Sequence, residues 1–93
     1  MIYVQFHLGD WLAQTRLLSA TERGVLFDLL TLYYTQERPI MRSQCERIAR
    51  AYAPDEKVAL EYVLSEYFEE RADGLHYAQA DAAIEECRER AEK

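Results

Sequence analysis

The stretch from Leu18 to Gln36 constrains the fold more than any other part of the sequence, because a defined helix start is followed by sustained helical periodicity. Ser19 and Glu22 have the spacing of a capping box, in which each side chain accepts a hydrogen bond from the other residue's backbone amide. Apolar side chains then recur on more than one helical face: Val25, Leu26, Leu29, Leu30, Leu32 and Tyr33. The sequence therefore predicts one long helix that packs on several sides.

Gly24 lies inside this predicted helix. Glycine in a helix interior costs about 1 kcal/mol relative to alanine. Close approach of another element would explain its presence, so we expect a tight contact at this turn.

The residues before the long helix predict an N-terminal arm that covers residues 1–18. Ile2–His7 alternates in character, which is typical of an extended edge segment. Asp10 is a suitable N-cap for a short helix, with Trp11 and Leu12 as its apolar anchors.

A short strand and a short helix are predicted after the long helix. Pro39 cannot continue a helix, and Ile40 is expected to form a very short strand. Ser43 and Glu46 repeat the capping-box pattern and indicate the start of the next helix. Its inner face is expected to consist of Cys45, Ile48, Ala49 and Tyr52.

Pro54 is expected in the first turn of a further helix that runs to about Tyr67. The predicted buried stripe of this helix consists of Leu60, Val63, Leu64 and Tyr67. Val58 and Tyr62 lie off that stripe, and an exposed apolar pair there would indicate a partner surface. Cover by the C-terminal helix is the alternative, and it is the one we expect.

Asp73-Gly74 is a strong signal for a two-residue hairpin turn, which would place Ala72 opposite Leu75. Residues 78–93 then predict a C-terminal helix with one narrow apolar seam. The seam consists of Ala80, Ile84, Cys87 and Ala91. So narrow a seam does not stabilise an isolated helix in water, and we expect the helix to dock on the domain or on a second copy of the chain.

Composition places the chain among folded proteins of one domain, residues 1–93, because 49% of its 93 residues are hydrophobic. No apolar run approaches the roughly 18 residues of a membrane span, and the first residues do not have the pattern of a signal peptide. Cys45 and Cys87 are far apart and are expected to be reduced thiols. We therefore expect a cytoplasmic protein that does not contact membranes.

The sequence contains no motif for catalysis, and we expect no enzyme, no metal, no cofactor and no small-molecule substrate. His7 and His76 each stand apart in sequence from a second ligand or base, so structural or surface roles are expected. The acidic pairs Glu69-Glu70 and Glu85-Glu86 consist of adjacent residues whose side chains diverge, which is typical of solvated charge.

The net charge of −6 is unevenly distributed along the chain. Residues 1–54 carry six arginines against five acids, whereas residues 55–93 carry twelve acids against five bases. The candidate nucleic-acid contacts are Arg38, Arg42, Arg47 and Arg50, with Glu46 as the one acid between them. Arg47 and Arg50 are three residues apart and are expected to share a helix face.

The order of helix, short strand, short helix, turn, helix and hairpin is that of a winged helix-turn-helix. The predicted fold class is therefore mainly α, with a winged helix-turn-helix core and hairpin wing at residues 19–77 and an extra C-terminal helix at residues 78–93. This assignment is an analogy of element order, and fold alone does not determine function.

An ordered set of residues that extends over nearly the whole chain has the pattern of a known family. The set consists of Gly9-Asp10-Trp11-Leu12, Thr15, Ser19, Glu22, Gly24, Leu29-Leu30, Tyr33-Tyr34, Pro39-Ile40, Ile48-Ala49-Arg50, Leu64, Phe68 and Asp73-Gly74. The set resembles the signature of the YdaU-type prophage domain, which is a domain of unknown function. Members of that family resemble the N-terminal parts of phage replication-initiation or replisome-organiser proteins. The resemblance therefore implies a winged-helix protein with a DNA-binding role.

Two functions stay open at this point. The first is a DNA-binding or replisome-associated protein of phage replication-initiation type, whose arginines contact phosphates. The second is a protein-interaction or oligomerisation module on the same fold, without direct DNA contact. The second helix of the predicted helix-turn-helix begins with the acidic stretch Pro54-Asp55-Glu56, which favours the second function. The resemblance to the YdaU-type domain favours the first.

Overall fold

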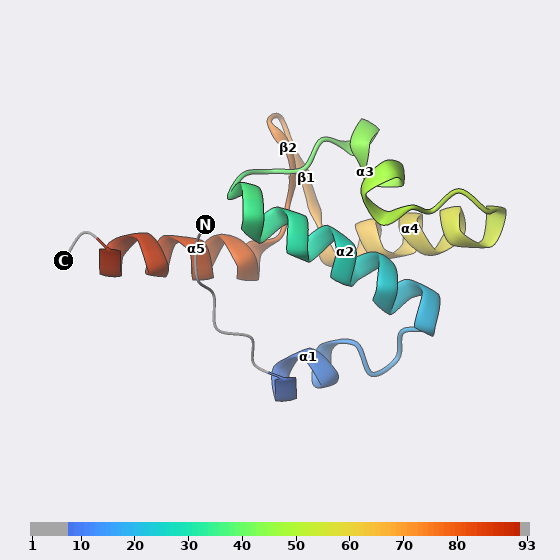
Figure 1. Cartoon of the computed structure of the whole chain (residues 1–93), viewed down its shortest axis with the longest axis horizontal. Coiled ribbons are helices and arrows are strands. Elements are labelled where there is room, and N and C mark those ends of the chain that lie inside the picture. The colour runs from blue at the N-terminus through green and yellow to red at the C-terminus, as the bar shows by residue number, and fades with distance from the viewer. Residues whose placement is uncertain (1–7, 92–93) are drawn as a thin grey trace.

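The computed structural model describes residues 8–91, and in this range it contains five helices and one two-stranded antiparallel sheet (Figure 1). The predicted extended segment Ile2–His7 lies outside the described residues. The elements are α1 (Leu8–Gln14), α2 (Ala20–Gln36), α3 (Arg42–Ala49), α4 (Pro54–Tyr67), β1 (Glu69–Arg71), β2 (Gly74–His76) and α5 (Ala78–Ala91). The prediction of a mainly helical fold with one small hairpin is confirmed.

Helix α2 lies at the centre and packs against α3, α4 and α5 (Figure 1). It begins with the predicted capping box: the Ser19 hydroxyl accepts from the Glu22 amide at 3.1 Å, and the Ser19 amide donates to Glu22 Oε1 at 2.8 Å. The helix ends where Glu37 adopts a left-handed conformation with φ 55°. Its buried residues are Val25, Leu26, Leu29 and Tyr33. Burial of each of the three aliphatic side chains contributes about 1.5–3 kcal/mol.

Gly24 does not mark a close approach, so that prediction is wrong. The residue is exposed, and a Cβ atom built on it would meet no atom within 4 Å. The glycine lies on the solvent side of α2, where neighbouring elements leave open space.

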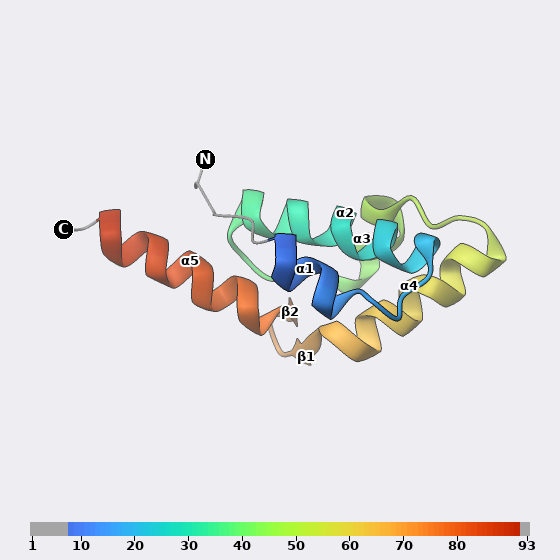
Figure 2. The same ribbon diagram turned by 90° about the horizontal axis from the view of Figure 1, so that it is seen from below.

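Helix α1 begins at Leu8, so Asp10 lies in its first turn, and the prediction of an Asp10 N-cap is wrong. Trp11 packs against the core as predicted, whereas Leu12 is exposed and anchors nothing there. Trp11 also meets Phe27 of α2 edge to face, at a ring-centroid distance of 5.8 Å, and α1 lies in front of α2 in the view from below (Figure 2).

Gln14 ties the end of α1 to distant parts of the chain. Its backbone carbonyl accepts from the Tyr67 hydroxyl at 2.7 Å, and its side-chain oxygen accepts from the Tyr77 hydroxyl at 3.0 Å. Its side-chain nitrogen donates to Gln79 Oε1 at 2.6 Å. Contacts to α4, to the end of the hairpin and to α5 therefore meet at one residue.

The predicted capping box at Ser43 does not form, because α3 begins two residues earlier than that box requires, at Arg42. Met41 is the N-cap residue and supplies no side-chain hydrogen bond. Tyr52 lies beyond the end of α3 and is exposed, so it does not belong to the inner face. The inward-facing residues of α3 are Cys45, Ile48 and Ala49.

The hairpin register differs by one residue from the predicted register. Arg71 pairs with Gly74 and Glu70 pairs with Leu75, so the turn residues are 72 and 73 and Ala72 has no partner across the strands. Leu75 is thereby buried and forms a bridge with Ile40, the expected very short strand, through hydrogen bonds of 3.1 and 2.8 Å. Gly74 has φ +133°, and a Cβ atom there would lie 3.0 Å from the Ile40 carbonyl oxygen, which explains the glycine.

One hydrophobic core joins α2, α3, α4, the hairpin and the first half of α5. The Phe68 ring lies between those of Tyr33 and Tyr77, at centroid distances of 6.5 and 5.4 Å. Helix α4 contributes Leu60, Val63 and Leu64, as predicted. Within residues 8–91, no helix is both long and apolar enough to cross a membrane.

Gly24→Ala is expected to stabilise the protein by about 1 kcal/mol, because alanine has the higher helix propensity and the added methyl group meets no neighbour. The free energy of unfolding from urea denaturation checks this. Gly74→Ala is the control and should destabilise, since its methyl group would press on the Ile40 carbonyl. A loss of stability in Gly24→Ala would contradict the account.

Candidate functional site

Arg42, the first residue of α3, is held by carboxylates from two other elements. Its Nη1 lies 3.4 Å from Glu61 of α4, and its Nε lies 3.3 Å from Glu70 of β1. The hydrogen bonds with Glu70 raise the pKa of the Arg42 guanidinium further above its ordinary value. Arg42 therefore joins α3 to α4 and the hairpin, and its charge is already balanced by acids.

Arg38, Arg47 and Arg50 are exposed, and none of them forms an ion pair with another residue in the described range 8–91. Arg47 lies in the last turn of α3, whereas Arg50 lies past its end in a left-handed conformation with φ 54°. The prediction that the two arginines share a helix face is not met, because Arg50 lies beyond the end of α3. Arg50 instead borders a shallow hollow of about 360 Å³ between α2 and α3, together with Asp28, Thr31, Leu32, Thr35 and Ile48.

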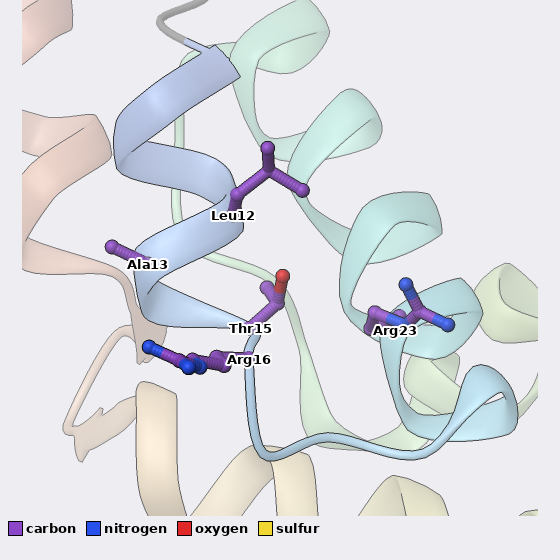
Figure 3. A pocket seen from close by; sticks show the side chains of 5 residues that line it. All are labelled: Leu12, Ala13, Thr15, Arg16 and Arg23. Carbon is purple, nitrogen blue, oxygen red and sulfur yellow. The ribbon is translucent and has the colours of Figure 1, made fainter.

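A second shallow hollow, of about 380 Å³, lies between α1 and α2 (Figure 3). Arg16 and Arg23 line it, but their side chains point to opposite sides. The Thr15 hydroxyl already donates a hydrogen bond to the Trp11 carbonyl, at 2.8 Å. Polar groups therefore do not converge there as a small-molecule site requires.

The solvent-facing side of α4 is acidic and partly apolar. Val58 is 71% exposed and Tyr62 is 46% exposed, so the expected cover by the C-terminal helix is wrong. The reason is the course of α5, which runs toward the opposite end of the molecule from the start of α4 (Figures 1 and 2). We define the α4 outer face as Asp55, Val58, Glu61, Tyr62, Ser65 and Glu66, all of which are exposed.

The predicted seam of α5 is used within the chain over its first half. Ala80 and Ile84 are buried in the hydrophobic core, and Cys87 is half-buried. The side chain of Ala91 lies outside what the structure describes. Arg88 adds an ion pair of 3.2 Å with Glu37 at the end of α2, so α5 docks on the rest of the domain.

His76 is the centre of a polar chain that sequence reasoning missed. Its Nε2 lies 2.8 Å from Asp73 Oδ1, and its Nδ1 lies 3.0 Å from Asp81 Oδ2. The hydroxyl of the buried Tyr33 donates to the other oxygen of Asp81. We call these four residues the Tyr33–Asp73 chain; it connects α2, α5 and the hairpin.

The geometry of this chain favours a protonated histidine. Both ring nitrogens face carboxylates, and only the imidazolium form has a proton on each nitrogen. The hydrogen bonds with Asp73 and then Asp81 raise the pKa of His76, whose side chain is 13% exposed. The hydrogen bond between His76 and Asp73 lowers the pKa of the Asp73 carboxyl. Burial, together with the hydrogen bond to Asp81, raises the pKa of Tyr33 to about 12. The predicted structural role fits this placement of His76, while His7 lies outside the described residues.

Asp73 and Asp81 are close to His76 in sequence and were the available signal for this chain. Within residues 8–91, the structure contains no group of three or more histidine, cysteine or acidic residues suited to hold a metal ion. Cys45 is buried in the core, and desolvation raises the pKa of its thiol to about 11. The thiol is therefore a poor nucleophile.

Stability should fall as the pH rises through the folded-state pKa of His76. A raised pKa means that the folded state favours the charged form, so this contribution is full below the unfolded value of 6.5 and is lost above the folded value. Asp73 acts in the opposite sense, and its contribution is lost as the pH falls through its lowered pKa. His76→Gln should therefore cost about 1 kcal/mol more at about pH 5.5 than at about pH 8.5 in urea unfolding. An equal cost at both pH values would rule out the charged chain.

The chain was compared with known proteins. No curated protein and no solved structure matches it. Residues 2–85 match the family described as "Protein of unknown function (DUF1376)". This match agrees with the expectation of an uncharacterised domain, while it does not bear on the resemblance to replication-initiation proteins. Because the match covers most of the sequence, the chain belongs to the DUF1376 family.

Proposed function

We propose that the chain is a winged-helix domain of phage replication-initiation type that contacts DNA phosphates without catalysing a reaction. The order of α2, the Ile40 bridge, α3, α4 and the hairpin supports the winged-helix part of the proposal. The resemblance of the sequence to YdaU-type domains supports the replication part.

The unequal pairing of cations is the observation that carries the proposal. Within residues 8–91, ion pairs occupy Arg42, Lys57, Arg71, Arg88 and Arg90. Arg38, Arg47 and Arg50 are exposed, are not among these pairs and all lie on or beside α3. Arg16 and Arg23 are also exposed and outside these pairs, but they lie at the α1–α2 hollow and point to opposite sides. Unpaired arginines are free to bind phosphate, and phosphate contacts supply most non-specific DNA affinity. We call these three residues the arginine surface.

Helix α4 is a poor candidate for reading base edges in this domain. Its outer face carries Asp55, Glu61 and Glu66, which would repel the phosphate backbone on either side of a groove. The proposed contact is therefore to the phosphate backbone, which positions a protein on DNA but carries little sequence information. The overall charge of −6 should keep the affinity low.

Arg47→Gln combined with Arg50→Asn should weaken binding to all DNA sequences and reduce the slope of log K against log salt by about two units. Asparagine is chosen at position 50 because it tolerates the left-handed backbone there. Fluorescence anisotropy of a labelled duplex at several salt concentrations gives the slope.

The matched control is Arg88→Gln with Arg90→Gln, which removes the same charge from arginines that are already paired on α5. The control should change the slope much less than the α3 variant. Equal effects of both variants would show that only net charge matters, and the assignment to the arginine surface would then be wrong.

A protein-interaction module without DNA contact is the second candidate, and the exposed Val58 and Tyr62 on the acidic α4 outer face favour it. The same titration separates the two functions. Binding of the parent protein at low salt supports the first, and absence of binding at low salt leaves the second.

A further inference from the structure

The α4 outer face has an apolar centre that the rest of the described chain leaves uncovered. Val58 and Tyr62 are four residues apart and therefore lie one above the other on the helix surface. Their exposed fractions of 71% and 46% are high for such side chains. Ser65 continues the same line, and its hydroxyl is turned back to the Tyr62 carbonyl at 2.8 Å.

Carboxylates frame this apolar line on both sides. By helical periodicity, Asp55 and Glu66 lie along one edge and Glu61 lies along the other. Glu61 also pairs with Arg42 at 3.4 Å, whereas Asp55 and Glu66 are in none of the ion pairs within residues 8–91. Lys57 lies beyond the edge of Glu61, and its ammonium group pairs with Glu46 at 3.5 Å. The charge that faces a partner along the line is therefore negative.

This combination excludes three occupants on grounds of charge. DNA and an anionic lipid surface would both bring phosphates against carboxylates. A second copy of the chain that docked through its own α4 outer face would bring one acidic face against another. Like charges that face each other across an interface are costly, so the complementary occupant is cationic.

We propose that the α4 outer face docks a basic amphipathic helix of a partner protein. Apolar side chains of that helix pack on Val58 and Tyr62, while its lysines or arginines reach Asp55, Glu61 and Glu66. The face spans about 17 Å, which corresponds to about three turns of a partner helix. An interface of this size supports a transient complex. This surface is separate from the arginine surface, and the proposal stands whether or not the chain binds DNA.

The test uses the whole chain, labelled with ¹⁵N, and a synthetic peptide of about 14 residues that combines lysines with leucines at helical spacing. A scrambled peptide of the same composition is the control for charge alone. Chemical-shift changes confined to α4 and its immediate neighbours, with weaker binding of the scrambled peptide, are the expected result. Equal binding of both peptides, or shift changes spread over all acidic surfaces, would overturn the proposal.

Variants sharpen the test. Val58→Ser with Tyr62→Ser should weaken peptide binding about tenfold. Leu17→Ser is the matched control, because Leu17 is 95% exposed and lies between α1 and α2 rather than on α4. Unfolding curves establish that each variant is folded. An equal effect of the control variant on peptide binding would contradict the proposal. Self-association of the parent protein that Val58→Ser abolishes would also contradict it, because the occupant would then be a second copy. Chemical-shift changes on the α4 outer face when DNA is added would contradict it as well.

Discussion

The hydroxyl of Tyr33 is the polar contact on which the relative positions of α2, α5 and the hairpin depend. Tyr33 is fully buried, and a buried hydroxyl needs a hydrogen-bond partner. Asp81 of α5 supplies that partner and also binds His76 of β2, which in turn binds Asp73 in the turn. The backbone bridge between Ile40 and Leu75 adds a second link, which joins the hairpin to the connection between α2 and α3.

Pairing within the fold separates the charges into two surfaces of opposite sign. Arg42 binds Glu61 and Glu70, so its charge is balanced by carboxylates of the same chain. The arginine surface keeps its charge, and the α4 outer face keeps its carboxylates and its apolar line. Under the two proposals, the arginine surface would hold a polyanion and the α4 outer face would hold a basic protein segment.

Local patterns in the sequence predicted more of the fold than of the candidate sites. The Ser19–Glu22 box was predictable because both partners lie within one helical turn. The same pattern at Ser43 failed because the chain enters α3 two residues earlier, with Met41 as the N-cap. The contacts of Arg42 with Glu61 and Glu70, and of Tyr33 with Asp81, join residues 19 to 48 positions apart. Such pairs depend on tertiary packing, which periodicity and capping patterns do not report.

The division into two surfaces is tested most directly by mapping a short DNA duplex onto the ¹⁵N-labelled protein by NMR at low salt. The account predicts chemical-shift changes at Arg38, Arg47, Arg50 and their neighbours in α3, with the amides of the α4 outer face unchanged. Shift changes centred on Val58 and Tyr62 would mean that α4 is the DNA-contacting helix after all, and would contradict the account.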